Sequence, residues 1–331
     1  MEFNVESNKQ NDNNLGKNNA LKTILSWKTL PILLVLLGMC LVLSIISPTF
    51  RTSDNFFNIL QQSAINAILA FGVTFVILVS GTDLSLGSVL AFSGMTMAMI
   101  IPTVGVPGSI AVAILIGAAF GAFNGFLVAY VGLAPFIVTM GTMSIGRGLT
   151  LVISNSSPVS GLPDSLRELA RGKLFGVLPI PVIIMLIIFL ISFILLRYTR
   201  FGRSLYAIGG NEEATRLSGI NVKIAKLGAF VWAGGMAGLA GVIQSARLNS
   251  AQPTAGVSYE MDAIAAAVIG GASLSGGVAS PFGTLLGALI IGVLRNGLNL
   301  MSVSTNWQQV VIGVVVIGAA ALDTLKQGKK D

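Results

Sequence analysis

Two adjacent stretches decide the fold: PIPVIIMLIIFLISFILL, residues Pro179–Leu196, and RYTRFGRSLYAIGGNEEATRLSGINVKIAK, residues Arg197–Lys226. The first has no charged side chain, and its length suits a membrane-spanning helix, which needs about 20 apolar residues. The second is a charged segment with long apolar blocks on both sides. This arrangement predicts an integral membrane protein in which Arg197–Lys226 forms a large charged loop.

The composition supports the same class. Hydrophobic residues make up 53% of the chain and charged residues only 10%, whereas soluble domains carry about 25% charged residues. The 39 glycines suit closely packed membrane helices. The net charge of +7 arises from loop lysines and arginines, so it does not indicate nucleic-acid binding. With no histidine and a single cysteine, Cys40, neither a disulfide framework nor a metal site is expected.

Apolar segments recur along the chain and predict an all-α membrane protein with about ten transmembrane helices. A polar cytoplasmic tail (1–29), expected to be disordered, precedes a transmembrane domain (30–323) and a short cytoplasmic tail (324–331). The eighth span is too short to cross alone and is expected to be broken or re-entrant. The spans are predicted near Leu30–Ile46, Ala64–Val79, Leu86–Ile101, Ser109–Tyr130, Pro135–Ile153, Pro179–Leu196, Leu227–Ala246, Asp262–Gly271, Phe282–Leu300 and Gln309–Leu322.

The distribution of positive charge predicts the orientation. The positive-inside rule places most loop lysines and arginines in the cytoplasm. The sequence satisfies this rule when both termini and the loop Arg197–Lys226 are cytoplasmic. An even number of crossings follows, and eight remains open if two segments are re-entrant. On this topology the outer side holds Arg51, Arg167, Arg171, Lys173, Arg247 and Arg295.

A short helix is predicted inside the charged loop. Asn211 can cap it, Glu212 and Glu213 suit its first turn, and Gly219 can end it. Glu212 and Arg216 are expected to pair at a spacing of four residues, and Ala214 and Leu217 are expected to form a small apolar edge. Such a helix is suited to docking on a soluble cytoplasmic partner.

The outer loop Ser154–Leu178 is predicted to contain a second short helix. Ser165 and Glu168 fit a capping box, Gly172 can end the helix, and Leu166 and Leu169 would form its apolar edge. Either a lid on the bilayer surface or a docking site for an extracytoplasmic partner would fit this pattern.

The pattern G-x-x-L-S-x-G occurs twice, at Gly81–Gly87 and at Gly271–Gly277. Glycine-rich backbone at membrane depth is tolerated where it lines a cavity or is buried in protein, and transporters often contain repeats with broken helices. Gly81, Gly87, Gly271 and Gly277 are therefore predicted helix-break glycines. An inverted repeat would place the two copies on opposite faces, whereas the predicted topology places both inside.

Polar residues at membrane depth are candidates for a transport path, because they are costly there. Asp83 is expected to cap the helix that begins near Ser85, with contact to a sugar as the alternative. Arg147 would either reach the headgroups or line the path. Asp262 fits a helix cap, and the asparagines are expected to join helices. The candidates are Asp83, Ser85, Asn66, Asn124, Arg147, Asp262, Asn296 and Asn299.

The sequence carries no catalytic constellation. Without histidine there is no histidine triad and no H-E-x-x-H zinc motif, and no G-x-x-x-x-G-K-[ST] phosphate loop is present. The chain is therefore predicted to be no enzyme and to bind no cofactor. If transport is driven by ATP, another chain must hydrolyse it.

Four segments carry a family resemblance: AIGGNEEATRLSGINV, ARLNSAQPTAGVSYEMDAIAAAVIGGASLSGG, GTDLSLGS and LRNGLNLMSVS. Together, from about residue 55 to residue 323, they resemble the membrane permease of bacterial ribose importers of the ATP-binding-cassette (ABC) type. Permeases for xylose, galactose and autoinducer-2 share much of the pattern. Two small departures are Gly277–Pro281, where a more basic stretch is common, and Trp307, where tyrosine is common.

The resemblance implies a bacterial inner-membrane protein and three kinds of protein partner. A second permease copy would complete the path, a cytoplasmic ATPase would hold Mg-ATP, and a periplasmic or lipid-anchored sugar-binding protein would deliver the substrate. Asn211–Gly219 would be the coupling helix that enters a groove of the ATPase, and Ser154–Leu178 with Arg247–Tyr259 would meet the binding protein. An ion-coupled secondary transporter and a passive channel or receptor module remain alternatives.

Overall fold

The computed structural model describes the backbone of residues 29–327 and side chains as far as residue 321. The predicted tail 1–29 lies outside this range except for Thr29. Of the predicted tail 324–331, only the backbone of residues 324–327 is described, and it continues the last helix.

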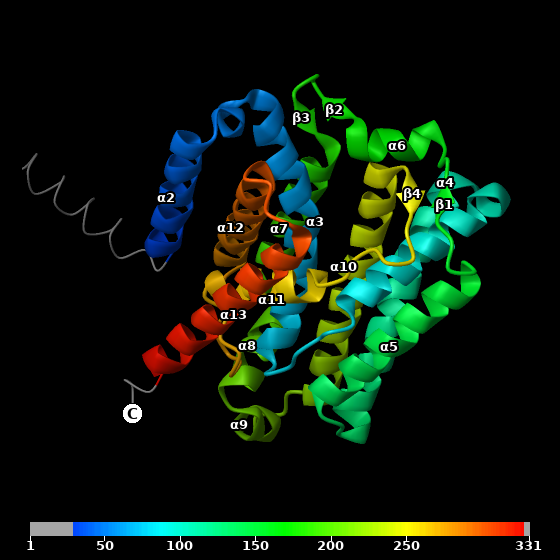
Figure 1. The fold of residues 1–331 in the computed structure, drawn as a ribbon. Helices are drawn as coiled ribbons and strands as arrows, with labels where there is room; N and C mark the ends of the chain where they lie inside the picture. The colour runs from blue at the N-terminus through cyan, green and yellow to red at the C-terminus, as the bar shows by residue number, and fades with distance from the viewer. Residues whose placement is uncertain (1–28, 328–331) are drawn as a thin grey trace, which may run out of the picture.

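The described part of the chain is almost entirely helical, which confirms the predicted all-α membrane class (Figure 1). Its strands are two-residue pieces that form two antiparallel pairs, β1 with β4 and β2 with β3. The helices are α2 (Leu30–Ile46), η1 (Pro48–Arg51), α3 (Ser53–Leu78), α4 (Leu86–Phe126), η2 (Leu127–Val131), α5 (Pro135–Ile153), α6 (Asp164–Arg171), α7 (Ile180–Tyr198), α8 (Arg200–Gly210), α9 (Glu212–Leu217), α10 (Val222–Leu248), α11 (Tyr259–Ile269), α12 (Pro281–Leu300) and α13 (Thr305–Gln327). The strands are β1 (Val159–Ser160), β2 (Lys173–Leu174), β3 (Leu178–Pro179) and β4 (Ser250–Ala251).

Each predicted span coincides with a helix or with half of the bent helix α4. Six helices in the described residues are long and apolar enough to cross a membrane: α3, α4 with η2, α5, α7, α10 and α12. Helix α2 and the part of α13 from Thr305 to Ala321 are shorter apolar segments. Helix α11 has 11 residues, about 16 Å at 1.5 Å per residue. It is therefore too short to cross a core about 30 Å thick, as the sequence predicted.

Helix α4 bends because Pro102 and Pro107 flank Gly105, whose φ of 71° and ψ of 171° are not helical. Proline removes a backbone donor and clashes with the preceding turn, and glycine accepts the positive φ. The bend divides α4 into the two spans expected from the sequence.

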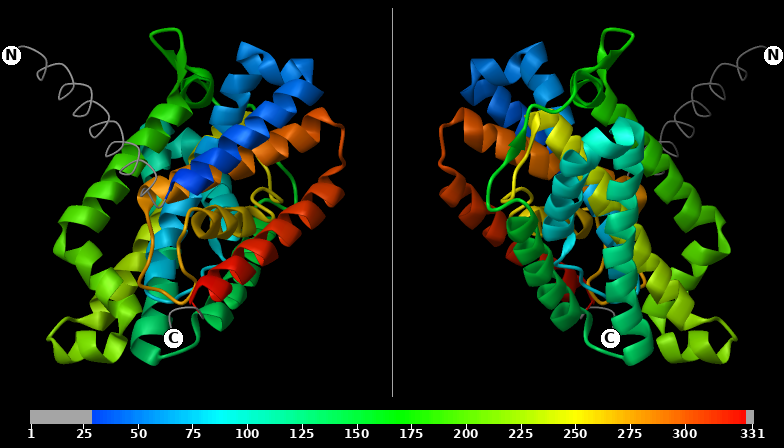
Figure 2. Two further views of the ribbon diagram at one scale, coloured as in Figure 1. Left: turned by 90° about the vertical axis from the view of Figure 1, so that its left-hand side faces the viewer. Right: turned by 90° about the vertical axis from the view of Figure 1, so that its right-hand side faces the viewer.

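Helices α3, α10, α11 and α12 form the buried centre, while α2, α5, α7 and α13 lie at the periphery. Figure 2 shows α2, α12 and α13 on one flank and α4 and α5 on the opposite flank. The peripheral helices expose large apolar side chains, among them Ile45, Val152 and Ile317 at 71–75%. In a membrane protein such surfaces face lipid or another membrane subunit.

Glycines bring α4 and α10 together along much of their length. A Cβ on Gly117 would overlap backbone atoms of Gly234 and Gly238, and one on Gly121 would overlap the carbonyl of Phe230. Small residues of this kind allow membrane helices to pack with their backbones in contact. This contact fixes the rotation of α10 about its axis. It thereby also fixes the position of the charged loop that leads into the N-terminus of α10.

Candidate functional site

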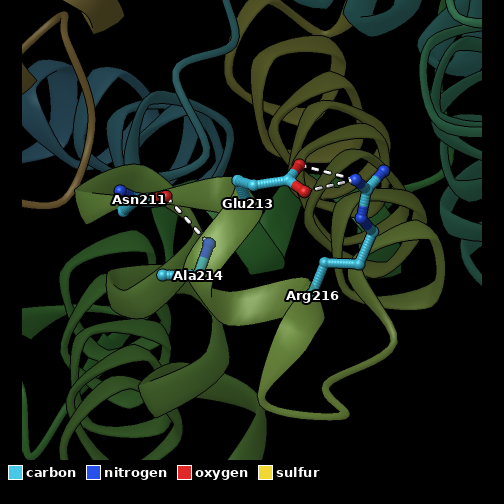
Figure 3. A network of polar contacts seen from close by, with 4 residues as sticks. All are labelled: Asn211, Glu213, Ala214 and Arg216. Atoms are coloured by element: carbon cyan, nitrogen blue, oxygen red, sulfur yellow. Dashed lines mark hydrogen bonds and ion pairs between the residues drawn. The ribbon is translucent and has the colours of Figure 1, made fainter.

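The predicted short helix in the charged loop is present as α9 at the end of the molecule opposite α6 (Figure 1). The Asn211 side chain accepts a hydrogen bond from the Ala214 amide at 2.9 Å, so the predicted N-cap is confirmed. Gly219, just beyond the helix, has a φ of +82°, the left-handed conformation with which glycine commonly ends a helix. Figure 3 shows this cap together with the ion pair of Glu213 and Arg216.

The two glutamates of α9 have different partners, and the predicted pair of Glu212 with Arg216 is wrong. Arg216 contacts Glu213 at 2.6 Å, within α9. Glu212 instead contacts Lys226 of α10 at 2.7 Å, and the Lys226 side chain is only 18% exposed. Because α9 is a single short turn beside α10, its first residue faces that helix. Glu212 therefore fastens α9 to the long helix α10.

The predicted edge of α9 is free for a partner. Ala214 is exposed and Leu217 is 79% exposed, although Leu217 is a large apolar side chain in a loop outside the spans. An exposed leucine on a capped, charged helix is suited to a shallow groove on a second protein.

A cavity of about 500 Å³ lies beside α9, bounded by the start of α10, the turn after η2 and the end of α3. Its charged lining residues are Glu212, Arg216, Lys223 and Lys226. The Lys223 ammonium lies 5.5 Å from the centre of the Tyr130 ring. The cavity thus brings the charged loop next to the glycine-rich segment that follows α3.

We call residues 79–85, between α3 and α4, the first break, and residues 270–280, between α11 and α12, the second break. The Ser80 hydroxyl donates to the Ser275 carbonyl at 2.8 Å, so the two breaks lie side by side. An inverted repeat with its copies on opposite faces is therefore wrong. Gly271 and Gly277 have positive φ values whereas Gly81 and Gly87 do not, so the two copies also differ in conformation.

The first break ends in a buried polar network that joins α4 to α5. Asp83 Oδ1 accepts from the Ser85 amide at 2.9 Å and from its hydroxyl at 2.6 Å. Asn124 donates to the Ser85 hydroxyl at 3.0 Å and accepts from Thr142 at 2.6 Å. Asp83 thus holds the amide of Ser85, the residue immediately before α4, where the sequence placed a cap, while its Oδ2 has no partner among the described residues.

Arg147 is bonded to the backbone of a distant segment. Its guanidinium donates to the carbonyls of Pro253 at 2.9 Å and Ala255 at 2.8 Å. It thereby ties α5 to the segment that leads from β4 to α11. In the same segment Gly256 packs against Gly87, where a Cβ on either residue would overlap the other's backbone. The starts of α4 and α11 consequently meet inside the bundle.

Asp262 and Arg295 form a buried ion pair, which corrects the expectation that Asp262 caps a helix. Arg295 donates to both Asp262 oxygens at 2.8 and 2.9 Å, and the two residues are 0% and 9% exposed. Asp262 makes no cap contact at the start of α11. Arg295 lies within α12, as the predicted span Phe282–Leu300 placed it, and Asp262 neutralises its charge. An arginine inside an apolar span was the sequence signal for this pair.

The asparagine candidates mainly join helices. Asn296 of α12 exchanges two hydrogen bonds with Asn55 of α3, at 2.7 and 3.1 Å. Asn299 accepts from Gln308 of α13 at 2.8 Å, and Asn66 is buried in α3. These contacts account for Asn124, Asn296 and Asn299 as links between helices.

The outer loop contains α6, but the predicted capping box is wrong. The helix starts after Pro163 without a side-chain cap, and Asp164 pairs with Arg167 at 2.6 Å. Leu166 is fully buried, and Leu169 packs against the core, which confirms the predicted apolar edge. The helix ends before Gly172, as expected. With β1 paired to β4, this end of the molecule is a packed cap over α4 and α10.

Among the residues that the structure describes, no cluster of three or more histidine, cysteine, aspartate or glutamate side chains could hold a metal ion.

A bundle of apolar helices with interrupted helices at its centre and a capped charged helix at one end defines a multi-pass membrane permease. The chain belongs to the family described as "Branched-chain amino acid transport system / permease component", whose model matches residues 55–320. Its curated relatives include permeases of ribose import, so the resemblance to that family is confirmed.

The chain is 48% identical over 309 residues to the ribose import permease protein RbsC of Escherichia coli (strain K12), covering 92% of this chain and 95% of the relative. It is 48% identical over 291 residues to the protein of the same name from Bacillus subtilis (strain 168), covering 87% and 90%. It is 45% identical over 279 residues to the D-allose transport system permease protein AlsC of Escherichia coli (strain K12), covering 83% and 85%. No solved structure matches the chain.

Proposed function

We propose that this chain forms the membrane path of an ATP-driven ribose importer. The observation that carries the proposal is α9, a capped helix with an exposed leucine, fastened to α10 through Glu212 and Lys226. The ribose import permeases at 48% identity support ribose as the substrate. An ion-coupled carrier or a passive channel needs no such docking helix.

The proposed partners follow from the two ends of the molecule. A cytoplasmic ATPase that holds Mg-ATP docks on α9, with Asn211, Glu212, Glu213, Ala214, Arg216, Leu217 and Gly219 as the coupling residues. A sugar-binding protein docks over α6 and the paired strands β1 and β4. A second copy of this chain completes the path in the bacterial inner membrane, both termini are cytoplasmic, and this chain itself binds no cofactor.

The substrate path is proposed to pass the meeting point of α4 and α11. Asp83 is the strongest candidate for sugar contact, because its Oδ2 is buried and has no partner in the described part of the chain. Ser85 bonds Asp83 directly and Asn124 bonds Ser85, while Arg147 bonds the segment that precedes α11 at the same meeting point. Gly81, Gly271 and Gly277 are proposed to let the breaks bend as the path opens, whereas Gly87, also expected in a break, lies in the first turn of α4.

Labelled ribose uptake tests the proposal in cells with and without this chain. Chain-dependent uptake that stops on ATP depletion, and survives collapse of the proton gradient while ATP is maintained, supports it. Uptake that follows the gradient contradicts the ATP-driven mechanism. Unlabelled D-allose is the competitor of choice, since a D-allose permease is also a relative; transport of D-allose without ribose contradicts the ribose assignment.

A further inference from the structure

Helix α8, which precedes α9, lies in direct contact with the second break and with Leu78, the last residue of α3, after which the first break begins. A Cβ on Gly209 would overlap the Leu78 carbonyl oxygen at the end of α3 and the Gly277 nitrogen of the second break. The Gly277 amide donates to the same Leu78 carbonyl at 3.0 Å. The backbones of three segments that are remote in the sequence thus meet at one point, where only glycine fits on α8.

A second contact holds α8 to the second break. The Tyr206 hydroxyl donates to the Ala279 carbonyl at 2.9 Å, just before α12 begins. Burial raises the pKa of Tyr206, and nearby Arg197 opposes this effect only in part. The hydroxyl therefore keeps its proton at neutral pH and remains a donor.

The connection from α8 to α9 is short. Only Asn211 separates the two helices. Its amide donates to the Ala207 carbonyl of α8 at 3.0 Å, while its side chain caps α9. With one residue bonded to both helices, a displacement of α9 must also displace α8.

We infer that α8 transmits the displacement of α9 directly to both helix breaks, and that Gly209 and Tyr206 are the positioning residues of this contact. The inference rests on the proposed function. Each break joins two buried helices, α3 with α4 and α11 with α12. Moving α8 therefore changes the angle at both junctions together, without a chain of intermediate side chains.

The neighbouring glycine supplies a matched control. A Cβ on Gly210 has no atom within 4 Å, so Gly210→Ala adds the same methyl group one residue away without a clash. In Gly209→Ala the methyl group meets backbone atoms, which cannot rotate away as a side chain can, and α8 must withdraw from the junction. Tyr206→Phe removes only the hydroxyl and keeps the ring.

The test uses the assembled importer, with ATPase and binding protein, in proteoliposomes, and measures ATP hydrolysed per ribose transported. For the unchanged chain, ATP-dependent uptake must be seen first; its absence contradicts the proposed function and not only this inference. We expect Gly209→Ala to raise the ATP cost per ribose at least about fivefold, the low end of measured coupling between sites. Tyr206→Phe should raise it less, and Gly210→Ala should leave it unchanged.

Two outcomes would overturn the inference. One is an unchanged ratio of ATP to ribose in Gly209→Ala, and the other is an equal rise in Gly209→Ala and Gly210→Ala. Should Gly209→Ala not accumulate in the membrane, Tyr206→Phe decides, because losing one hydroxyl at a partly exposed position leaves the fold in place. An unchanged ratio in Tyr206→Phe then refutes the role of α8.

Discussion

The buried ion pair of Asp262 and Arg295 offers a sharp test of the packing described above. In Asp262→Asn the carboxylate is replaced by an amide of the same shape, and Arg295, only 9% exposed, keeps its charge without a counter-charge. Breaking a buried pair by removing one partner costs about 3–5 kcal/mol. We expect a loss of this size in the free energy of unfolding.

The matched control is Asp164→Asn. Asp164 and Arg167 lie 2.6 Å apart, but their side chains are 87% and 33% exposed. Exposed pairs contribute about 0–1 kcal/mol because water and salt screen them. The two variants remove the same charge, one from a buried pair with two hydrogen bonds between helices and one from an exposed pair with a single hydrogen bond within α6, so the buried pair should show the larger loss.

The assay is the unfolding of purified protein by sodium dodecyl sulfate in mixed micelles, followed by circular dichroism. The double variant Asp262→Leu with Arg295→Met should recover most of the loss, because a buried pair replaced by apolar groups is often neutral or stabilising. The reasoning would be refuted if Asp262→Asn cost no more than Asp164→Asn. It would also be refuted if the double variant were as unstable as the sum of its single changes.

Three further predictions concern helix packing, the segment between β4 and α11, and helix α9. Gly234→Ala should reduce the amount of folded protein in the membrane, because its methyl group would overlap the backbone of α4 at Gly117. Gly235→Ala should leave that amount unchanged, because its methyl group meets nothing within 4 Å. Fluorescence-detected size exclusion measures the amount of folded protein for both variants. Arg147→Gln should raise the equilibrium constant for opening of the segment between β4 and α11 by about tenfold or more, since hydrogen bonds to charged groups contribute about 1.5–3 kcal/mol. The labelling rate of a cysteine placed in that segment measures this opening. Arg147→Lys should recover part of the effect. Asn211→Ala should lower the stability of helix α9 by about 1 kcal/mol, because the cap is lost. The loss should be seen as faster amide hydrogen exchange in α9. In Asn211→Ser, which keeps a capping side chain, the amides of α9 should exchange nearly as slowly as in the unchanged chain.

Local features of this protein could be predicted well from its sequence. The spans follow from hydropathy summed over about 20 residues, and the bend of α4 falls between two predicted spans. The cap of α9 by Asn211 and its end at Gly219 depend on residues within one turn of each other. The contact of Asp83 with Ser85 is of the same kind, because Ser85 lies two residues away.

Pairings between distant residues could not be predicted in this way. Asp262 meets Arg295 at a separation of 33 residues, and Glu212 meets Lys226 at a separation of 14. The pair of Glu212 with Arg216 was expected from helix spacing, but α9 is too short and too close to α10 for spacing alone to decide.

The sequence by itself thus determined that this chain is an all-α membrane permease, where its apolar helices lie and where its charged helix α9 begins and ends. The tertiary structure decided which polar groups neutralise one another, that the two breaks lie side by side, and that α8 contacts the second break and the end of α3. The physical reason is that hydropathy and helix capping act over a few neighbouring residues. The rotation and depth of each helix, by contrast, are set by contacts such as Gly117 against Gly234, which join segments far apart in the chain.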